Sequence, residues 1–208
     1  MRARRDVTIE HALVHAQAIV TEQGAGAVTV SEIARRLGMR APSLYKYFPS
    51  LHSIYDALFA RGNARVTAFV QAASQDAEPG LERTLASARA MVRWSMQEPG
   101  LAALLYWRPI PGFVPSEESF APSRQMWEQW REDLRTAVRD GDLASSADSE
   151  RAMRMLTVLL SGISSQQMAN QPDASYDDGV FSSLTDEALE MFVRHHQPSG
   201  NTREKEAR

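Results

Sequence analysis

The segment from residue 29 to 48, TVSEIARRLGMRAPSLYKYF, limits the fold of this chain more than any other stretch of its sequence. Thr29 followed three residues later by Glu32 has the spacing of a capping box, which marks the start of a helix. Gly38 suits the positive φ at which many helices end, and Pro42 suits the first turn of a following helix. These signals predict two short helices joined by a tight turn.

The apolar residues of this segment recur where two short crossing helices need to face a shared core. They are Ile33, Leu37, Met39, Leu44, Tyr47 and Phe48. An amphipathic helix from about Thr8 to Gln23, ended by Gly24 and Gly26, precedes them and completes a three-helix head. The arrangement is a helix-turn-helix, whose second helix can lie in the major groove of DNA.

The polar and aromatic residues in and around that second helix are the expected contacts to DNA. They are Thr29, Arg40, Pro42, Ser43, Tyr45, Lys46, Tyr47 and His52. Arg40 can pair with guanine through two hydrogen bonds, and Lys46 can do the same or neutralise a phosphate. Thr29 stands at a helix N-terminus, where its hydroxyl and the backbone N–H groups can meet a phosphate oxygen.

The other arginines near the N-terminus have open interpretations. Arg35 and Arg36 fit a solvated helix face better than a DNA contact. Arg2, Arg4 and Arg5 form a basic arm that either reaches a minor groove or is a disordered terminus.

Composition excludes several classes of protein. The chain has 208 residues and no cysteine, which excludes disulfides, thiolate metal sites and a cysteine nucleophile. No apolar run reaches the roughly 18 to 20 residues of a membrane span, and the basic start lacks the apolar core of a signal peptide. We therefore expect a cytoplasmic protein with no membrane partner. Residues 1–61 carry eight basic and five acidic side chains, against 15 and 21 in the remainder, which supports a nucleic-acid contact near the N-terminus.

The rest of the chain has the periodicity of helices and no convincing strand, so we expect an all-α fold of about nine helices. A fourth helix, about 51–74, connects an N-terminal DNA-binding domain, 1–50, to a C-terminal domain, 75–196. The last helix is expected from about Gly179 to His195. The polar tail, 197–208, is expected to be disordered.

The run SEIARRLGMRAPSLYKYFPS, with this helical plan, resembles the tetracycline-repressor (TetR) family of bacterial transcription regulators. The specific resemblance covers about residues 8–60, and beyond them only length and helical pattern match. It implies a homodimer with two DNA-reading heads on a palindromic operator, and a C-terminal half that binds a small-molecule effector. Family members often have a lysine near the start of helix 4 that touches phosphate. Leu51 stands there in this chain, so His52, Tyr47 or backbone N–H groups must supply any such contact.

Methionines and aromatic residues in the C-terminal half suit an adaptable cavity for a hydrophobic or amphipathic ligand, although ordinary core is the alternative for each. The candidates are Met91, Trp94, Trp107, Phe113, Met126, Trp127, Trp130 and Met155. Phe113 and Val114 lie in a proline-rich loop, residues 108–116, and are candidates for the mouth or lid of such a pocket.

The last two predicted helices carry apolar residues with small residues between them, which permit close helix approach. The apolar candidates for a dimer interface are Leu156, Leu159, Ile163, Phe181, Leu184 and Phe192. The last two helices form the four-helix bundle of the dimer in the resembled family. Burial inside a monomer is the alternative.

Enzyme interpretations fail on residue types. His11 and His15 have the spacing of two zinc ligands, yet Ala12 stands where the catalytic glutamate is needed. No glycine-rich phosphate loop occurs, so we expect no catalytic residue, metal or cofactor. The favoured function is a ligand-responsive transcription regulator, a repressor. A ligand-independent activator or co-regulator and a helical enzyme or carrier with a vestigial head are the alternatives.

Overall fold

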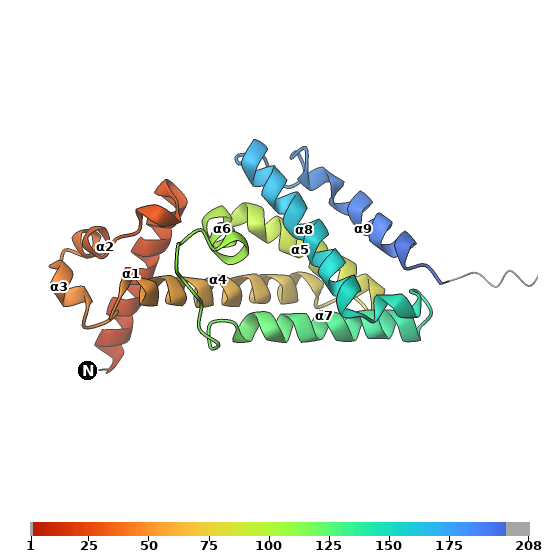
Figure 1. The fold of residues 1–208 in the computed structure, drawn as a ribbon, viewed down its shortest axis with the longest axis horizontal. Coiled ribbons are helices and arrows are strands. Elements are labelled where there is room, and N and C mark those ends of the chain that lie inside the picture. The colour runs from red at the N-terminus through yellow and green to blue at the C-terminus, as the bar shows by residue number, and fades with distance from the viewer. Residues whose placement is uncertain (1, 199–208) are drawn as a thin grey trace, which may run out of the picture. The chain divides into compact units, whose positions relative to one another are not determined.

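The computed structural model describes residues 2–198, which form nine α-helices and no strand (Figure 1). The expected all-α fold is therefore confirmed. The helices are α1 (Arg2–Gln23), α2 (Val30–Arg36), α3 (Ala41–Leu44), α4 (Leu51–Ser74), α5 (Leu81–Gln97), α6 (Pro99–Trp107), α7 (Ala121–Arg139), α8 (Glu150–Asn170) and α9 (Thr185–His195). No helix in this part of the chain is long and apolar enough to cross a membrane. Residues 199–208 of the expected disordered tail lie outside the described residues.

The described residues fall into two compact units that interleave along the chain. Unit 1 contains the residues up to Ala68 together with Trp94–Gln125. Unit 2 contains Phe69–Arg93 and the residues from Met126 onward. The expected limits follow the order of the chain, whereas α6 and the loop after it group with the N-terminal helices, and α6 packs against α1.

The first helix is longer than the sequence predicts, because it begins at Arg2 rather than near Thr8. The residues before Thr8 include no glycine or proline, and alanine and arginine favour helix. Arg4 and Arg5 are therefore part of a helix rather than a disordered arm. The guanidinium of Arg5 lies 5.7 Å from the ring centroid of Tyr47, a cation–π contact.

The core of unit 1 forms where α1, α2, α3 and the first half of α4 meet; we call these elements the head (Figure 1). Ile33 and Leu44 are fully buried, which confirms the predicted crossing of two short helices. The Tyr55 hydroxyl donates a buried hydrogen bond of 2.7 Å to the carbonyl of Ala25. Burial raises the pKa of Tyr55, so the phenol remains a donor.

Local signals place α2 and the turn after it. The Thr29 hydroxyl accepts from the Glu32 N–H at 3.1 Å and caps the helix, as predicted. The Glu32 carboxylate accepts from Arg35 Nε at 2.8 Å and from Arg36 Nε at 2.9 Å. Gly38 ends the helix with a φ of 67°. Thr29 thus serves as a helix cap and Gly38 adopts a positive φ, which are the roles that threonine and glycine favour.

Within unit 2, α8 and α9 lie alongside each other (Figure 1). The ninth helix begins at Thr185 rather than near Gly179. The side-chain carbonyl of Gln167 accepts from the N–H groups of Phe181 and Ser182 at 2.9 and 3.1 Å. These tertiary bonds fix the backbone in a short turn before the α-helix can start.

The positive φ of Gly38 yields a prediction for stability. We expect Gly38→Ala to lower the free energy of unfolding by about 1–2 kcal/mol, because an L side chain is strained in the left-handed region. A Cβ at this position would meet no neighbour within 4 Å, so backbone strain is the only cost. Urea denaturation of the full chain measures the difference.

Gly26→Ala is the matched control, since it also faces open space but has no positive φ. We expect Gly26→Ala to change the free energy of unfolding by less than about 0.5 kcal/mol. Equal losses in the two variants would contradict the explanation from backbone strain.

Candidate functional site

The predicted recognition helix is the short helix α3, Ala41–Leu44, in the structure. Arg40 is the N-cap residue of α3, and Pro42 lies in its first turn. The helix ends at Leu44, and the N–H groups of Tyr47 and Phe48 both bond to the Leu44 carbonyl, at 2.9 and 3.0 Å. Residues 45–47 are therefore presented by the turn that follows the helix.

Side chains around α3 divide between the core and an open surface. Leu44 is fully buried, whereas Arg40, Pro42 and Lys46 are exposed and Tyr45 keeps 52% of its surface open. Ser43 and Tyr47 are half-buried. The side chains of Arg40 and Lys46 make no hydrogen bond or ion pair with any described residue, so both charges are available to phosphates or base edges.

Arg36, in contrast, is held within the head. Only 18% of its side chain is exposed, and it pairs with Glu22 of α1 at 2.7 Å as well as with Glu32. The prediction of a solvated face is therefore wrong for Arg36, because the fold brings Glu22 beside it. Arg35, with 72% of its side chain exposed, fits that prediction. Hydrogen bonds from Arg35, then Arg36, lower the pKa of Glu32 from 4.5 to about 2.

The flanks of α3 add further polar groups. Thr29 uses an oxygen lone pair for its capping bond, which leaves its hydroxyl hydrogen free to donate. His52 is exposed in the first turn of α4, and its ring centroid lies 6.1 Å from that of Phe113. Leu51 is half-buried against the core of the head, so it offers no group to a phosphate.

Phe113 lies in unit 1 as part of an aromatic cluster. It is 6% exposed, and its ring centroid lies 5.8 Å from that of Tyr55 and 6.3 Å from that of Phe59. The side chain of Phe113, a predicted ligand contact, thus packs against α4 in the core of the head rather than at the mouth of a cavity. Val114, beside it, is 81% exposed.

Four other predicted ligand contacts meet in unit 2. Met91, Met126, Trp127 and Trp130 line a closed cavity together with Thr157, which the sequence analysis missed. The cavity measures about 10 Å³, the space of one water molecule. The indole N–H of Trp130 is buried and has no hydrogen-bond partner among the described residues. We call this site the α7 cavity.

The remaining predicted ligand contacts lie apart from the α7 cavity. Trp94 is buried in unit 1, and Trp107 is 45% exposed. Met155 lines a different pocket of unit 2, with His195 and His196.

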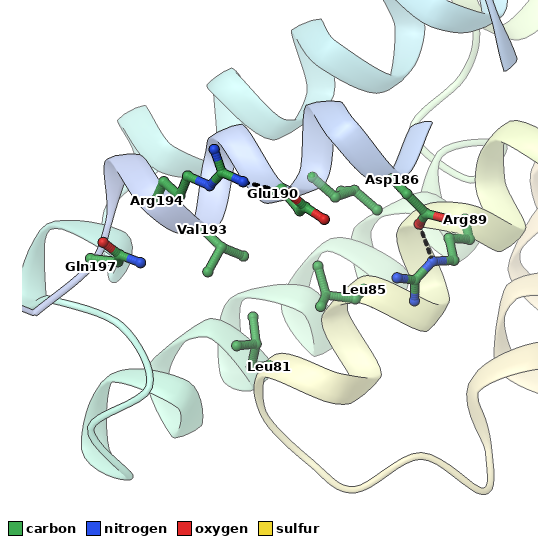
Figure 2. A pocket seen from close by; sticks show the side chains of 9 residues that line it. Leu81, Leu85, Arg89, Asp186, Glu190, Val193, Arg194 and Gln197 are labelled. Atoms are coloured by element: carbon green, nitrogen blue, oxygen red, sulfur yellow. Dashed lines mark hydrogen bonds and ion pairs between the residues drawn. The ribbon is translucent and has the colours of Figure 1, made fainter. Parts of the chain in front are cut away.

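Unit 2 also has a larger groove, of about 500 Å³, between α5 and α9 (Figure 2). Leu81 and Leu85 of α5 face Val193 of α9 across it. An ion pair of 2.6 Å between Arg89 and Asp186 crosses from one helix to the other. No predicted ligand contact lines this groove.

The residues that the sequence predicts for a dimer interface differ in how deeply their side chains are buried. Leu156 and Phe192 are buried in the core of unit 2, which matches the alternative of burial inside a monomer. Leu159, Ile163 and Phe181 are half-buried, and Leu184 is 46% exposed. The most exposed apolar side chains of α8 and α9 are Val158, at 69%, and Met191, at 61%, which the sequence analysis missed. Helical spacing could have found Val158, since it points away from its buried neighbours Leu156 and Leu160.

The described residues include no group of three or more side chains that could hold a metal ion. His11 and His15 of α1 therefore stand without a third ligand.

Comparison with known families matches both halves of the chain. Residues 13–58 match the bacterial regulatory proteins of the tetR family, and residues 84–192 match the tetracyclin repressor-like C-terminal domain. An HTH-type transcriptional regulator of Mycobacterium bovis is 25% identical over 130 residues, which cover 61% of this chain. The match spans only 56% of that relative's length.

Solved structures share the fold over nearly the whole chain. A protein of unknown function from Rhodococcus sp. RHA1 superposes with a TM-score of 0.76 at 21% identity, covering 92% of this chain and 96% of that one. A regulatory protein of the tetR family from Rhodococcus RHA1 gives a TM-score of 0.70 at 20% identity, covering 92% and 98%.

The lowered pKa of Glu32 yields a prediction for acid stability. Because the folded pKa lies below the ordinary value, the stabilisation is complete above pH 4.5 and is lost as the pH falls through about 2. We expect Glu32→Gln to be less stable than the natural chain at pH 7, and this gap to close between pH 4.5 and 2. Urea denaturation at several pH values measures the gap.

Glu128→Gln is the control, since Glu128 is exposed on α7 and has no ion pair among the described residues. It should show no such gap. A gap for Glu32→Gln that stays constant over this range would contradict the assigned pKa.

Proposed function

Because the chain belongs to the tetracycline-repressor family of DNA-binding transcription regulators, we propose that it is a repressor that a small ligand releases from a palindromic operator. Its family membership makes it a regulator rather than an enzyme. The repressor role, the operator and the ligand are the proposed parts.

The observation that carries the DNA part of the proposal is the surface around α3. Arg40, Tyr45 and Lys46 are exposed there over a fully buried Leu44, so the core fixes the backbone that presents them. Arg40 is the N-cap residue of α3, and the N-terminal end of a recognition helix is the part that usually meets base edges. One bidentate contact from arginine to guanine discriminates by about 1–3 kcal/mol.

A dimer would place two such surfaces on one operator. We assign its interface to three exposed apolar side chains, Val158 of α8, Met191 of α9 and Leu184, which directly precedes α9. Gly162, one turn from Val158, faces open space and permits close approach of a second helix. A two-fold dimer would read half-sites about 34–36 Å apart, or a multiple of that distance.

The ligand part of the proposal rests on the α7 cavity. Its lining combines two methionines, which are flexible, with two tryptophans. At about 10 Å³ the cavity is too small for an organic effector, so side chains of its lining must move for one to enter. A ligand that favours the open state by about 1–3 kcal/mol suffices to shift the affinity for DNA.

The closed state of the α7 cavity also favours a second candidate, a regulator that needs no small ligand. In this conformation the α7 cavity has space for about one water molecule. Such a protein would be an activator or co-regulator whose DNA binding does not change with small hydrophobic compounds.

A gel-shift experiment on the DNA that flanks the chain's own coding region tests the proposal. We expect sequence-selective binding that weakens as salt rises, because phosphate contacts release counterions. Absence of selective, salt-sensitive binding there would contradict the repressor assignment. A shift that no hydrophobic compound reverses would favour the ligand-independent regulator.

Substitutions around α3 should separate base contacts from phosphate contacts. We expect Arg40→Ala to weaken operator binding by about 1–3 kcal/mol and to relax selectivity at one base pair. Lys46→Ala should weaken binding to all sequences alike and reduce the salt slope by about 1. Fluorescence anisotropy with operator and scrambled duplexes measures both effects.

Arg139→Ala removes an exposed arginine of α7 in unit 2, outside the proposed dimer interface, and serves as the control, with no expected change in DNA affinity. If Arg40→Ala and Lys46→Ala behave like this control, the surface around α3 is not the DNA contact.

The proposed interface on α8 and α9 predicts that Met191→Glu yields monomers. A charge on a side chain that is 61% exposed in the protomer should spare folding, yet it would have to be buried in the dimer. Sedimentation velocity measures the oligomeric state, and circular dichroism checks the fold.

Val14→Glu is the matched control, because Val14 is 50% exposed and belongs to α1 of unit 1 rather than to α8 or α9. It should leave the dimer intact. A dimeric Met191→Glu variant would move the interface to another surface.

A further inference from the structure

Unit 2 has a pocket whose lining carries positive charge and no acid. It measures about 340 Å³ and lies where the N-terminus of α8 meets the C-terminus of α9. Its lining includes Ser146, Ser149, Arg151, Met155, His195 and His196, and no aspartate or glutamate. We call it the α8 pocket. It shares no lining residue with the α7 cavity.

The guanidinium of Arg151 in the α8 pocket has no counter-ion among the described residues. Arg151 makes no hydrogen bond or ion pair with any described residue, although the guanidinium has five donors. The two nearest acids in sequence are engaged elsewhere, since Asp148 pairs with Arg135 at 3.5 Å and Glu150 with Arg154 at 2.7 Å. Neither acid lines the pocket.

His196 contributes a buried nitrogen without a partner. The residue is 4% exposed, and its Nδ1 lies 2.9 Å from the Ser146 hydroxyl. Nε2 is buried and has no partner in the described part of the chain. The Ser146 hydroxyl can donate to Nδ1, which leaves the proton on Nε2 as a donor that needs an acceptor. The ring centroid of His195 lies 4.8 Å from that of His196.

The N-terminus of α8 also favours an anion in the α8 pocket. Ser149 caps this helix by accepting from the Ala152 N–H at 3.1 Å, and the helix extends for 21 residues. The N-terminus of a helix of this length attracts negative charge through its dipole and its free N–H groups. The α8 pocket therefore brings together one guanidinium, two imidazoles and the N-terminus of a helix.

We propose that the α8 pocket binds a small organic anion, with its carboxylate or phosphoryl oxygens toward Arg151, His195 and His196. The volume of about 340 Å³ lies within the roughly 300–1,000 Å³ of small-molecule sites and exceeds what a bare inorganic anion needs. Met155 offers an apolar surface to the body of such a ligand. The pocket is a second ligand site of the chain, and it does not depend on the repressor assignment.

Benzoate titration of the full chain tests this site, with benzamide as a neutral probe of the same shape. The Cε1–H resonances of His195 and His196, assigned through His195→Gln and His196→Gln, report occupancy by NMR. We expect saturable shifts with benzoate and none with benzamide. Bound benzoate should also raise the pH at which His196 titrates, because an anion favours the imidazolium.

Arg151→Gln and Arg154→Gln form the matched pair, since both arginines are exposed on α8 and only Arg151 lines the pocket. The affinity for benzoate should fall at least about tenfold in Arg151→Gln and stay unchanged in Arg154→Gln. Equal losses of benzoate affinity in the two variants would overturn the proposal. Equal resonance shifts with chloride at the same ionic strength would attribute the effect to charge screening and would also overturn it.

An acidic side chain of a second copy is the competing occupant, because α8 and α9 also carry the exposed Val158 and Met191. Dilution without added anion separates the two cases. Histidine resonances that shift with protein concentration and ignore benzoate would assign the pocket to the subunit contact, and the proposal would fall. Resonances that respond to benzoate at constant protein concentration support it.

Discussion

The head keeps its shape because the first half of α4 closes its core. Tyr55 ties α4 to the chain between α1 and α2 through its bond to the Ala25 carbonyl, and Leu44 of α3 is fully buried in the same core. Phe113, from a loop far along the chain, packs on the same Tyr55 ring. Because interiors are close-packed, a displacement of α4 must alter how α3 presents Arg40. Within unit 1, α4 is thus one element whose displacement would reach the proposed DNA-contacting surface.

Local chemistry made much of this fold predictable. The Thr29 cap, the positive φ of Gly38 and the buried Leu44 depend on residues a few positions apart, and each follows from the sequence. Residue type also placed Met126 and Trp130 among the candidates for a cavity, and both line the α7 cavity. Such signals need no knowledge of distant contacts.

Contacts between distant segments account for what the sequence did not reveal. The sequence predicts a solvated Arg36, because Glu22, 14 residues earlier, meets it only in the folded head. It predicts Phe113 at the mouth of a pocket, because its partner Tyr55 lies 58 positions away. Periodicity marks a side chain as apolar but does not choose its neighbour, so Leu156 could not be assigned to core or interface from spacing alone.

Hydroxyl-radical footprinting on the DNA that flanks the chain's own coding region tests the central claim most directly. Two heads of one dimer should protect two patches related by a dyad, with centres about 34–36 Å apart or a multiple of that distance. The patches should share one half-site sequence in opposite orientations, because in this account the same Arg40 and Lys46 would read each of them. A single protected patch without a dyad, or no protection at all, would contradict the account of paired heads on a palindromic operator.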